Sequence, residues 1–266
     1  MEDKITVSAV FITYNEERNI GRALHSVRDI ADEIVVLDSG SKDSTESIAA
    51  SFGAVFHYRK FEDFATQKNA AVSIAKMDYV LVLDADEELS EPLRAWLISF
   101  KSGAYAKFRE IAGFYIPRKS SFLGKWINHS GWFPDYTMRL FKRGCGKFNR
   151  VRVHESCEVT GKTFRIPPAL FMWHYTYESL EQYFIKFNSY TSMAAEDLKE
   201  KGSAPSIIKI MVNPLFGFIK QYFIKLGFMD GFHGFVLAVV SAYYVFVKYA
   251  KHFFLCYGPR PGKGRP

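Results

Sequence analysis

Residues 79–86 read YVLVLDAD, an apolar run that ends in two aspartates separated by one alanine. An unbroken run of Tyr, Val and Leu is typical of a strand that is buried on both faces of a parallel sheet. Open α/β sheets bind their ligands at the carboxyl ends of their strands. The stretch therefore predicts an α/β fold in which Asp84 and Asp86 lie at the binding edge.

The segments before this strand repeat its design. Residues 5–13 (ITVSAVFIT) form another apolar run, and shorter ones follow at 33–37 and 55–58. Helical spacing of apolar residues occupies the segments between them, at 16–27, with Asn15 as its N-cap, at 45–52 and at 65–75. This alternation predicts βαβ units and an open, mostly parallel sheet. Shorter, aromatic-rich runs at 113–159 predict a mixed sheet edge that walls the site.

Polar residues gather after three of the predicted strands. They are TYNEE at 13–17, DSGSKDST at 38–45 and DADEE at 84–88. Because the carboxyl ends of parallel strands meet at one edge, we expect the three clusters to converge. Carboxylates together with diphosphate oxygens suit Mg²⁺ or Mn²⁺, so DAD predicts a metal site in which Asp86 ranks above Asp84. The alternative is that these acids only cap the next helix.

The chain carries a formal net charge of +7, and the position of that charge decides its meaning. Nine of the 35 Lys and Arg residues but one of the 28 acids lie after residue 200, so the first 200 residues are close to neutral. The basic part is also the most apolar, which suits an anionic lipid surface better than nucleic acid. We therefore expect a membrane surface, and no nucleic acid, as a partner.

The C-terminal part is predicted to be helical. Residues 179–198 place apolar side chains at helical spacing, with Ser179 and Gln182 positioned as a capping box. The stretch at 232–247 is uncharged but shorter than the ~20 residues that cross a bilayer. We expect a helix that lies in the membrane interface. A spanning helix, or a soluble helix of a dimer or an acceptor site, is the alternative.

Neither end of the chain nor its cysteines predicts export. The polar residues 1–4 run directly into the first strand, so we expect no signal peptide and a sheet domain that faces the cytoplasm. The three cysteines, Cys145, Cys157 and Cys256, are far apart and form no CxxC pair. They are expected to be free thiols rather than a zinc or redox site.

The order of these motifs resembles glycosyltransferase family 2, the inverting group with a GT-A fold. The matching segments lie within about 5–160 and read SAVFITYNEERNI, VVLDSGSKDST, QKNAA, VLVLDADEEL, MRLFKR and RVHE. Within the family the chain is most similar to lipopolysaccharide core glycosyltransferases, often β-glucosyltransferases of the inner core. The resemblance implies an α/β, GT-A nucleotide-sugar-binding catalytic domain with a mostly parallel central sheet at 1–168. A membrane-associating helical region would follow at 169–258, and a disordered basic tail at 259–266.

The resemblance also implies roles for individual residues. Tyr14 corresponds to the residue that stacks on uracil, unless it is a core tyrosine, and Asp38 to the one that contacts the base or ribose. Lys68 would face the nucleotide or its phosphates, or be a solvated helix lysine. Arg139 and Arg143 are unranked alternatives for that electrostatic task. The nucleotide-binding set is Thr13, Tyr14, Asn15, Glu16, Asp38, Lys68, Asp84 and Ala85, and the metal set is Asp86, Asp84 and His154.

An inverting transfer needs one base behind the acceptor hydroxyl while a metal stabilises the leaving nucleoside diphosphate. Glu155 in RVHE is the candidate base, and Asp135 in WFPDY is its rival. His154 is the neighbour most able to ligate the metal, although a lone histidine is more often only hydrogen-bonded. The candidates for stacking on acceptor sugars, or for wall packing, are Trp132, Phe133 and Tyr136.

We therefore expect an inverting transferase that moves a hexose, with glucose as the first choice, from a UDP-sugar to a glycolipid such as the lipopolysaccharide inner core. It would use Mg²⁺ or Mn²⁺ and act as a peripheral protein on the cytoplasmic face of the inner membrane. One alternative is a family 2 transferase that acts on polyprenyl phosphate or another acceptor. Another is a nucleotidyltransferase, although YNEERN lacks the glycine-rich basic loop of that class. The oligomeric state, the preferred metal and the acceptor hydroxyl stay open.

Overall fold

The computed structural model describes residues 4–104, 108–149 and 156–257. The chain divides into two units, which are described separately here. The sheet unit comprises residues 1–120 and 134–176, and the helical unit comprises residues 121–133 and 177–266. This division differs from the predicted boundary at residue 168. Residues 169–176 lie in the sheet unit, and residues 121–133 of the predicted catalytic domain lie in the helical unit.

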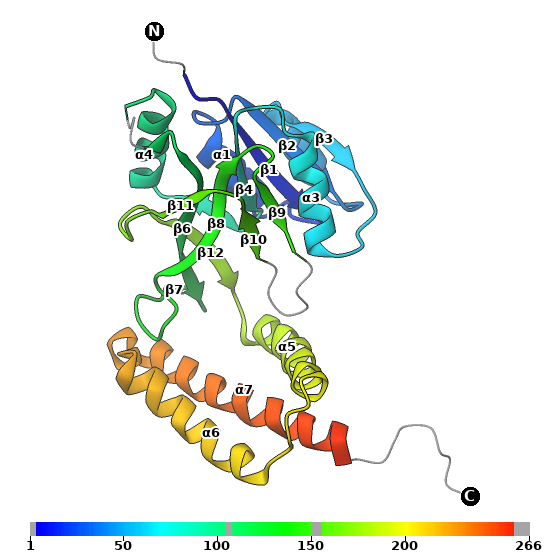
Figure 1. Cartoon of the computed structure of the whole chain (residues 1–266), viewed down its shortest axis with the longest axis vertical. Helices are drawn as coiled ribbons and strands as arrows, with labels where there is room; N and C mark the ends of the chain where they lie inside the picture. The colour runs from blue at the N-terminus through cyan, green and yellow to red at the C-terminus, as the bar shows by residue number, and fades with distance from the viewer. Residues whose placement is uncertain (1–3, 105–107, 150–155, 258–266) are drawn as a thin grey trace, which may run out of the picture. The chain divides into compact units, whose positions relative to one another are not determined.

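The sheet unit is built on the predicted parallel strands (Figure 1). In the order β3-β2-β1-β4 all pairs are parallel, which confirms the expected α/β architecture. The next strands, β8 and β6, are antiparallel, as expected for the mixed edge, and β12 and β5 complete the order. The bounds are β1 Val7–Thr13, β2 Glu33–Asp38, β3 Val55–Tyr58, β4 Tyr79–Asp84, β5 Glu87–Leu89, β6 Ile111–Phe122, β8 Asp135–Lys142 and β12 Met172–Tyr177.

The sheet unit contains two further strand pairs. The strand β11 (Lys162–Arg165) pairs in parallel with β6. The strands β9 (Gly146–Phe148) and β10 (Cys157–Val159) form a separate antiparallel pair. The RVHE motif falls within residues 150–155. His154 and Glu155 therefore lie outside the described residues.

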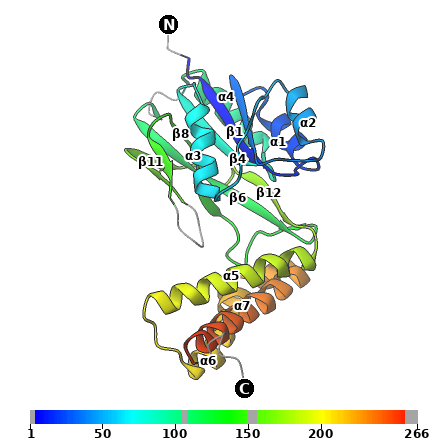
Figure 2. The ribbon, with the colours of Figure 1, turned by 90° about the vertical axis from the view of Figure 1, so that its right-hand side faces the viewer.

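Helices cover both faces of the sheet (Figure 2). One face packs against α1 (Ile20–Val27), α2 (Thr45–Ser51) and α4 (Glu91–Lys101), and the other against α3 (Phe64–Ile74). Side chains of β1 alternate between the two layers: Phe11 packs in the first and Val10 in the second. A strand covered on both sides is largely apolar on both faces, which is why its sequence shows no polar alternation; its one buried polar side chain before the strand end, Ser8, donates to Glu33.

The predicted start of the first helix is wrong. The helix begins at Ile20 rather than Glu16, and Asn19, not Asn15, occupies the N-cap position. Asn15 instead adopts a left-handed conformation with φ 54°, which asparagine tolerates better than most residues. The helices α3 and α4 begin with side-chain caps: Asp63 accepts from the Thr66 amide, and Ser90 from the Leu93 amide.

The helical unit contains α5 (Leu180–Glu200), α6 (Ile207–Ile219) and α7 (Gly231–Tyr257). The predicted amphipathic helix is confirmed as α5: the Ser179 hydroxyl accepts from the Gln182 amide, and the Gln182 side chain accepts from the Glu178 amide. A π-helical turn, η2 (Lys220–Ile224), continues α6, and a 3-10 turn, η3 (Gly227–Asp230), precedes α7. The core of the unit gathers Phe122, Ile127, Tyr183, Phe187, Leu237 and Val240.

Asp230 joins the corner between α6 and α7 to the loop at 121–133. Its carboxylate is 1% exposed and accepts from the amides of Asn128 (3.1 Å) and His129 (2.9 Å). The Lys125 ammonium donates to the Asp230 carbonyl at 2.7 Å, and β7 (Lys125–Trp126) pairs with the end of β6. One carboxylate therefore holds two distant segments of the chain together.

We expect Asp230→Ala to lower the free energy of unfolding of the helical unit by about 2–3 kcal/mol, because buried donors lose their acceptor. Chemical denaturation followed by tryptophan fluorescence and by limited proteolysis at 121–133 measures the loss. Asp230→Asn retains one acceptor oxygen and should lose less. Equal stability of wild type and Asp230→Ala would contradict this role.

Candidate active site

The loops that follow β1 and β2 are tied together through Asp38, which is 3% exposed. Its Oδ2 accepts from the hydroxyls of Thr13 (2.8 Å) and Ser41 (2.5 Å). Its Oδ1 accepts from the amides of Gly40 and Ser41, both at 2.7 Å. A carboxylate offers about four acceptor positions, so these bonds use its capacity. Asp38 thus braces the turn, and its contact with a base or ribose stays a prediction.

A second set of bonds joins the same two loops. The Asn15 side chain accepts from the Lys42 amide at 2.9 Å, and the Glu16 amide donates to the Thr45 hydroxyl at 2.9 Å. Desolvation opposes ionisation of Asp43, but hydrogen bonds from Thr45 and the Glu17 amide outweigh it and lower the pKa of Asp43. The cross-links give the carboxyl edge of β1 and β2 a defined shape.

Tyr14 is 59% exposed at this edge, so its ring is not part of the core. The structure thereby excludes the alternative of a core tyrosine and leaves the stacking role as a prediction. Tyr58 at the end of β3 is 68% exposed, and a Cβ atom at Gly40 would lie 3.2 Å from its ring. Gly40 has φ 103°, so a side chain there would be strained as well as crowded.

An alternating chain of charges crosses the site behind the DAD triplet. Asp84 is 2.8 Å from the Lys68 ammonium and 2.6 Å from the Arg139 guanidinium. Arg139 also contacts Glu87 at 2.6 Å. Glu87 in turn lies 3.3 Å from Arg118, which donates to Oδ2 of Asp135 at 2.7 and 3.0 Å. The order Lys68, Asp84, Arg139, Glu87, Arg118, Asp135 balances three positive against three negative groups.

Burial makes this chain of ion pairs energetically demanding. The side chains of Lys68, Arg139 and Glu87 are 3%, 4% and 0% exposed. Burial by itself would raise the pKa of Asp84, but the charges of Arg139 and Lys68 hold that pKa well below its usual range. Burial likewise opposes the charge on Arg139, whereas Asp84 and Glu87 raise the pKa of its guanidinium. Asp84 and Arg139 are thus kept ionised by their charged partners.

The structure ranks the two arginines that sequence left equal. Arg139 lies in the ion-pair chain beside Asp84. Arg143 donates to the carbonyl of Met77, which precedes the start of β4. Because β8 runs antiparallel to β4, Arg143 lies at the end of β4 opposite to Asp84. Arg139 is therefore the arginine of the site, and Lys68 is a buried partner of Asp84 rather than a solvated lysine.

Asp86 has a different neighbour from Asp84. Its Oδ2 lies 3.6 Å from Nε2 of His174 on β12, and its carbonyl accepts from the Tyr175 amide at 2.9 Å. The other ring nitrogen, Nδ1 of His174, lies 3.0 Å from the Ser120 hydroxyl and 3.2 Å from that of Thr176. These hydroxyls fix the ring with Nε2 toward Asp86, as partners of metal-ligating histidines do.

Asp86 and His174 fit a divalent metal better than the other acids of the triplet region. Two ligands of one octahedral ion at 2.0–2.1 Å lie roughly 3 Å apart, close to the separation of these two atoms. Asp84 and Glu87 are held by cations, and Glu88 accepts from the Tyr175 hydroxyl at 2.9 Å. Among the described residues no group of three or more His, Cys, Asp or Glu gathers around one point, so an ion here would need phosphate or water oxygens as well.

Sequence analysis missed His174. The residue stands in MWHYTY, after the region assigned to catalysis, and nothing local distinguishes it from a structural histidine. The predicted ligand His154 and the predicted base Glu155 lie outside the described residues. Asp135, the rival base, is held by Arg118 and keeps 43% of its side chain exposed. Ala85 is 5% exposed between the two aspartates.

The aromatic candidates for the acceptor have packing partners. Trp132 stacks edge-on against Phe122 at 5.7 Å within the helical unit. The Tyr136 hydroxyl donates to the Ile166 carbonyl at 3.1 Å, with the Arg165 guanidinium 5.4 Å above its ring. These contacts favour wall packing for both residues.

Comparison with known proteins defines the class. Residues 8–99 match the model of "Glycosyl transferase family 2". A glycosyltransferase from Rickettsia bellii is 33% identical over 92% of this chain and 85% of its own. The lipopolysaccharide core biosynthesis glycosyltransferase LpsC of Rhizobium meliloti is 28% identical over 94% of this chain and 93% of its own. The protein is thus an enzyme of the glycosyltransferase class.

The fold agrees with this class. A mannosyltransferase from Pyrobaculum calidifontis, solved with GDP-Man and Mn²⁺, has a similar fold with a TM-score of 0.55 and 13% identity, over 94% of this chain and 88% of its own. The α/β fold is of the GT-A type. The chain belongs to glycosyltransferase family 2.

Proposed function

We propose that this enzyme transfers a hexose, with glucose as the first choice, from a UDP-sugar to a glycolipid such as the lipopolysaccharide inner core, with inversion. The acceptor class is supported by the similarity to LpsC, which covers nearly the full length of both chains. The donor sugar follows from the family resemblance of the β1, β2 and β4 motifs. The place of action would be the cytoplasmic face of the inner membrane.

The observation that carries the proposal is the pair Asp86 and His174 at the carboxyl edge of the parallel strands. These two residues would hold Mg²⁺ or Mn²⁺, which when bound neutralises the diphosphate of the leaving nucleotide. The ion-pair chain cannot do this alone, because each of its cations already faces a carboxylate and its formal charge sums to zero. A separate source of positive charge is needed beside it.

The residues of this chain would orient the reactants around that charge. The cross-linked loops at 13–17 and 38–45 shape the nucleotide side, with the exposed Tyr14 ring stacking on the base. Lys68, Asp84 and Arg139 support the floor at the end of β4. The base that takes the acceptor proton is Glu155 or Asp135, and Arg118 holds Asp135 in one orientation.

The test is turnover of a panel of UDP- and GDP-sugars with Mn²⁺, Mg²⁺ or EDTA, with and without a delipidated or intact inner-core glycolipid. We expect slow metal-dependent hydrolysis of one UDP-hexose and faster transfer when the glycolipid is present, with the anomeric configuration inverted in the product. Transfer to polyprenyl phosphate instead would reassign the acceptor. Absence of binding and turnover with every nucleotide sugar would reject the donor assignment, and release of pyrophosphate from a nucleoside triphosphate would indicate a nucleotidyltransferase.

A further inference from the structure

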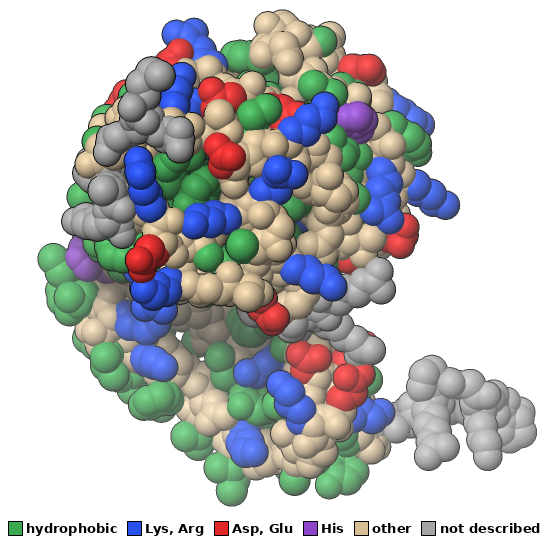
Figure 3. All heavy atoms as spheres, turned by 45° about the horizontal axis from the view of Figure 1, so that its top comes forward, with side chains coloured by type: hydrophobic (Ala, Val, Ile, Leu, Met, Phe, Trp, Pro, Cys, Tyr) green, Lys and Arg blue, Asp and Glu red, His purple; other side chains and the backbone are tan. Residues whose placement is uncertain are grey.

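The helix α6 and the turn η2 that continues it expose a continuous apolar face. No side chain of Ile207–Ile219 is buried, and Ile208 and Met211 are 73% and 68% exposed. The large exposed apolar residues are Ile207, Ile208, Met211, Val212, Leu215, Phe216, Ile219, Phe223 and Ile224. Their spacing of one, three and four residues places most of them on one side of the helix. Apolar side chains protrude along the outer edge of the helical unit in Figure 3, with Lys and Arg among them.

The helix α7 adds a second exposed stripe. It consists of Phe232, Phe235, Val239, Tyr243, Phe246 and Phe254, while Leu237, Ala238 and Val240 between them are buried. The two helices pack together through aromatic contacts, with the Phe235 ring 6.1 Å from Phe218 and 5.9 Å from Tyr222. Contiguous exposed apolar surface of this extent marks a partner that is itself apolar.

The exposed charges that α6, η2 and α7 themselves carry have one sign. Between Ile207 and Tyr257 the charged side chains are Lys209, Lys220, Lys225, Lys248 and Lys251 together with Asp230. Asp230 is buried and bonded to the loop at 121–133, so its charge is not presented outward. Because α6, η2 and α7 themselves add lysines and no exposed acid to this apolar surface, it complements an anionic lipid leaflet. The exposed acid Glu196 belongs to α5 and lies beside Phe246 and Phe254, near the C-terminal end of α7.

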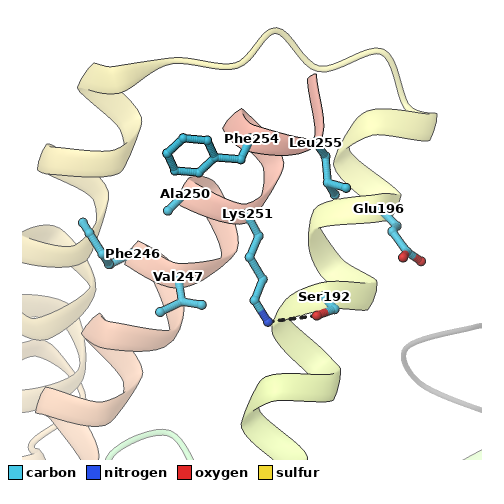
Figure 4. Close-up of a pocket in the computed structure, with 8 residues that line it drawn as sticks. All are labelled: Ser192, Glu196, Phe246, Val247, Ala250, Lys251, Phe254 and Leu255. Carbon is cyan, nitrogen blue, oxygen red and sulfur yellow. Dashed lines mark hydrogen bonds between the residues drawn. The ribbon is translucent and has the colours of Figure 1, made fainter. Parts of the chain in front are cut away.

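Length and composition alone would permit α6 with η2 (Ile207–Ile224), and η3 with α7 (Gly227–Tyr257), to cross a membrane. Contacts with α5 argue against this. Near its start α5 packs Tyr183 and Phe187 into the core with Leu237. Further along, the Lys251 ammonium of α7 donates to Asn188 and Thr191 of α5 at 2.8–2.9 Å. It also donates to the Ser192 hydroxyl at 2.8 Å, the bond drawn in Figure 4.

These contacts make α5 and α7 one packed pair over much of their length. The exposed side of α5 carries charged residues, among them Glu181, Lys186, Glu196, Lys199 and Glu200. If α7 crossed the bilayer, α5 would enter the hydrocarbon with it, and charges in that layer cost several kcal/mol each by insertion measurements, about 2.5–3.5 kcal/mol for Asp, Lys or Arg at the centre.

The corner between α6 and α7 is restrained as well. Asp230 binds it to Asn128 and His129, and the Ser130 amide donates to the Lys225 carbonyl at 2.9 Å. The loop at 121–133 continues at both ends into strands of the sheet unit, β6 and β8. A hairpin with its corner across the bilayer would have to carry this polar loop through the hydrocarbon, where unpaired backbone groups are not tolerated.

We propose that the helical unit is a monotopic anchor: the exposed faces of α6 and α7 lie in the interfacial layer of one anionic leaflet, and neither helix crosses the bilayer. This inference refines the proposed action at a membrane surface and is independent of the donor and metal chemistry. The corner at 225–230 and the start of α6 then stay on the same side of the membrane. The α5 helix backs the anchor on its water side.

Co-flotation of the full-length protein with vesicles tests the surface. We expect binding to vesicles that contain phosphatidylglycerol and weaker binding to phosphatidylcholine alone. Ile208→Glu and Phe216→Glu should each reduce binding by about tenfold or more, because burial of one such side chain is lost. Ile98→Glu is the matched control, since Ile98 is an exposed isoleucine (47%) on α4 of the sheet unit. Equal binding of Ile208→Glu, Phe216→Glu and wild type would overturn the proposal, as would lipid-free dimers that these substitutions dissociate.

Labelling with a membrane-impermeant maleimide tests the topology. Lys201→Cys and Lys225→Cys are placed singly in a Cys145→Ser, Cys256→Ser background, in which only the buried Cys157 remains, and are studied in sealed inverted vesicles, whose cytoplasmic face is outward. We expect both positions to react without detergent, and protection of Lys225→Cys alone would show a spanning hairpin. Hydrolysis of the donor in detergent should be unchanged in Ile208→Glu. If neither wild type nor any variant hydrolysed the donor while flotation with vesicles stayed intact, the proposed function would be rejected and the membrane anchor would stand.

Discussion

Asp86→Ala is expected to lower metal-dependent turnover of the sugar donor by about 10²–10³-fold, since a bound metal supplies several kcal/mol of charge stabilisation in such transfers. The reason lies in the division of labour at the end of β4: Asp84 faces Lys68 and Arg139, whereas Asp86 faces His174. The measurement is the initial rate over a Mn²⁺ titration, together with Mn²⁺ binding followed by electron paramagnetic resonance.

His174→Ala should behave in the same way, and the double variant should be little worse than either single one if both residues hold one ion. The matched control is Asp78→Ala. The Asp78 carboxylate accepts from the amide and the hydroxyl of Thr6. Asp78 directly precedes β4, at the end of the strand opposite to Asp86, so its replacement should leave the metal dependence unchanged. An unaltered Mn²⁺ titration in both Asp86→Ala and His174→Ala would remove the metal site from this position.

Arg139→Met is expected to reduce the free energy of unfolding by about 3–5 kcal/mol, the usual consequence of leaving buried charges without their partner. Glu87 would lose its 2.6 Å partner with its side chain fully buried, and Asp84 would keep only Lys68. Denaturant unfolding monitored by circular dichroism measures the effect. Arg143→Met is the matched control: Arg143 directly follows β8, is exposed and donates to a backbone carbonyl. A comparable loss of stability in this variant would contradict the assignment.

The same variant should change the response to acid. The pKa of Asp84 is depressed in the folded protein, so its contribution to stability is present above the unfolded value of about 3.9 and disappears as pH falls through the lower folded value. Without Arg139 the depression shrinks. Wild type should therefore lose more stability than Arg139→Met between pH 5 and the acid transition, and parallel curves would show that Arg139 does not set the pKa of Asp84.

The strands were predictable because each one carries its own signal. A run such as YVLVL at 79–83 stays apolar without alternation because both of its faces are covered, and the aspartates that follow it mark the end of the strand. The first helix was placed four residues early because Asn15 was read as a cap. In the structure Asn15 bonds to Lys42, a partner 27 residues away that no helical pattern encodes.

The roles of the two aspartates were harder to predict. The local pattern favours Asp86 over Asp84 as the metal ligand but does not show their partners. Lys68 of α3 and Arg139 of β8 lie beside Asp84, whereas His174 of β12 lies beside Asp86. Likewise, Lys68 could be a solvated helix lysine or a buried one, and its ion pair with Asp84 decides between them. Helices that span a membrane and helices that lie in its interface have similar compositions. The contacts of α5 with α7, and those of Asp230 with the loop at 121–133, are needed to distinguish the two arrangements.

Several properties of this protein can be predicted from its residues alone. They are the α/β class, the order of the motifs along the chain, the carboxyl edge of the sheet at which the motifs meet, and the basic, apolar character of the C-terminal helices. These properties follow from residues that are neighbours in sequence, through periodicity, turn chemistry and charge. Only the packing of the folded chain shows which carboxylate faces a histidine, which cations are used in ion pairs, and how the corner of the helical unit is held. These contacts join different elements of the chain, from 16 residues apart for Lys68 and Asp84 to 101 residues apart for His129 and Asp230, and they form only when those elements pack.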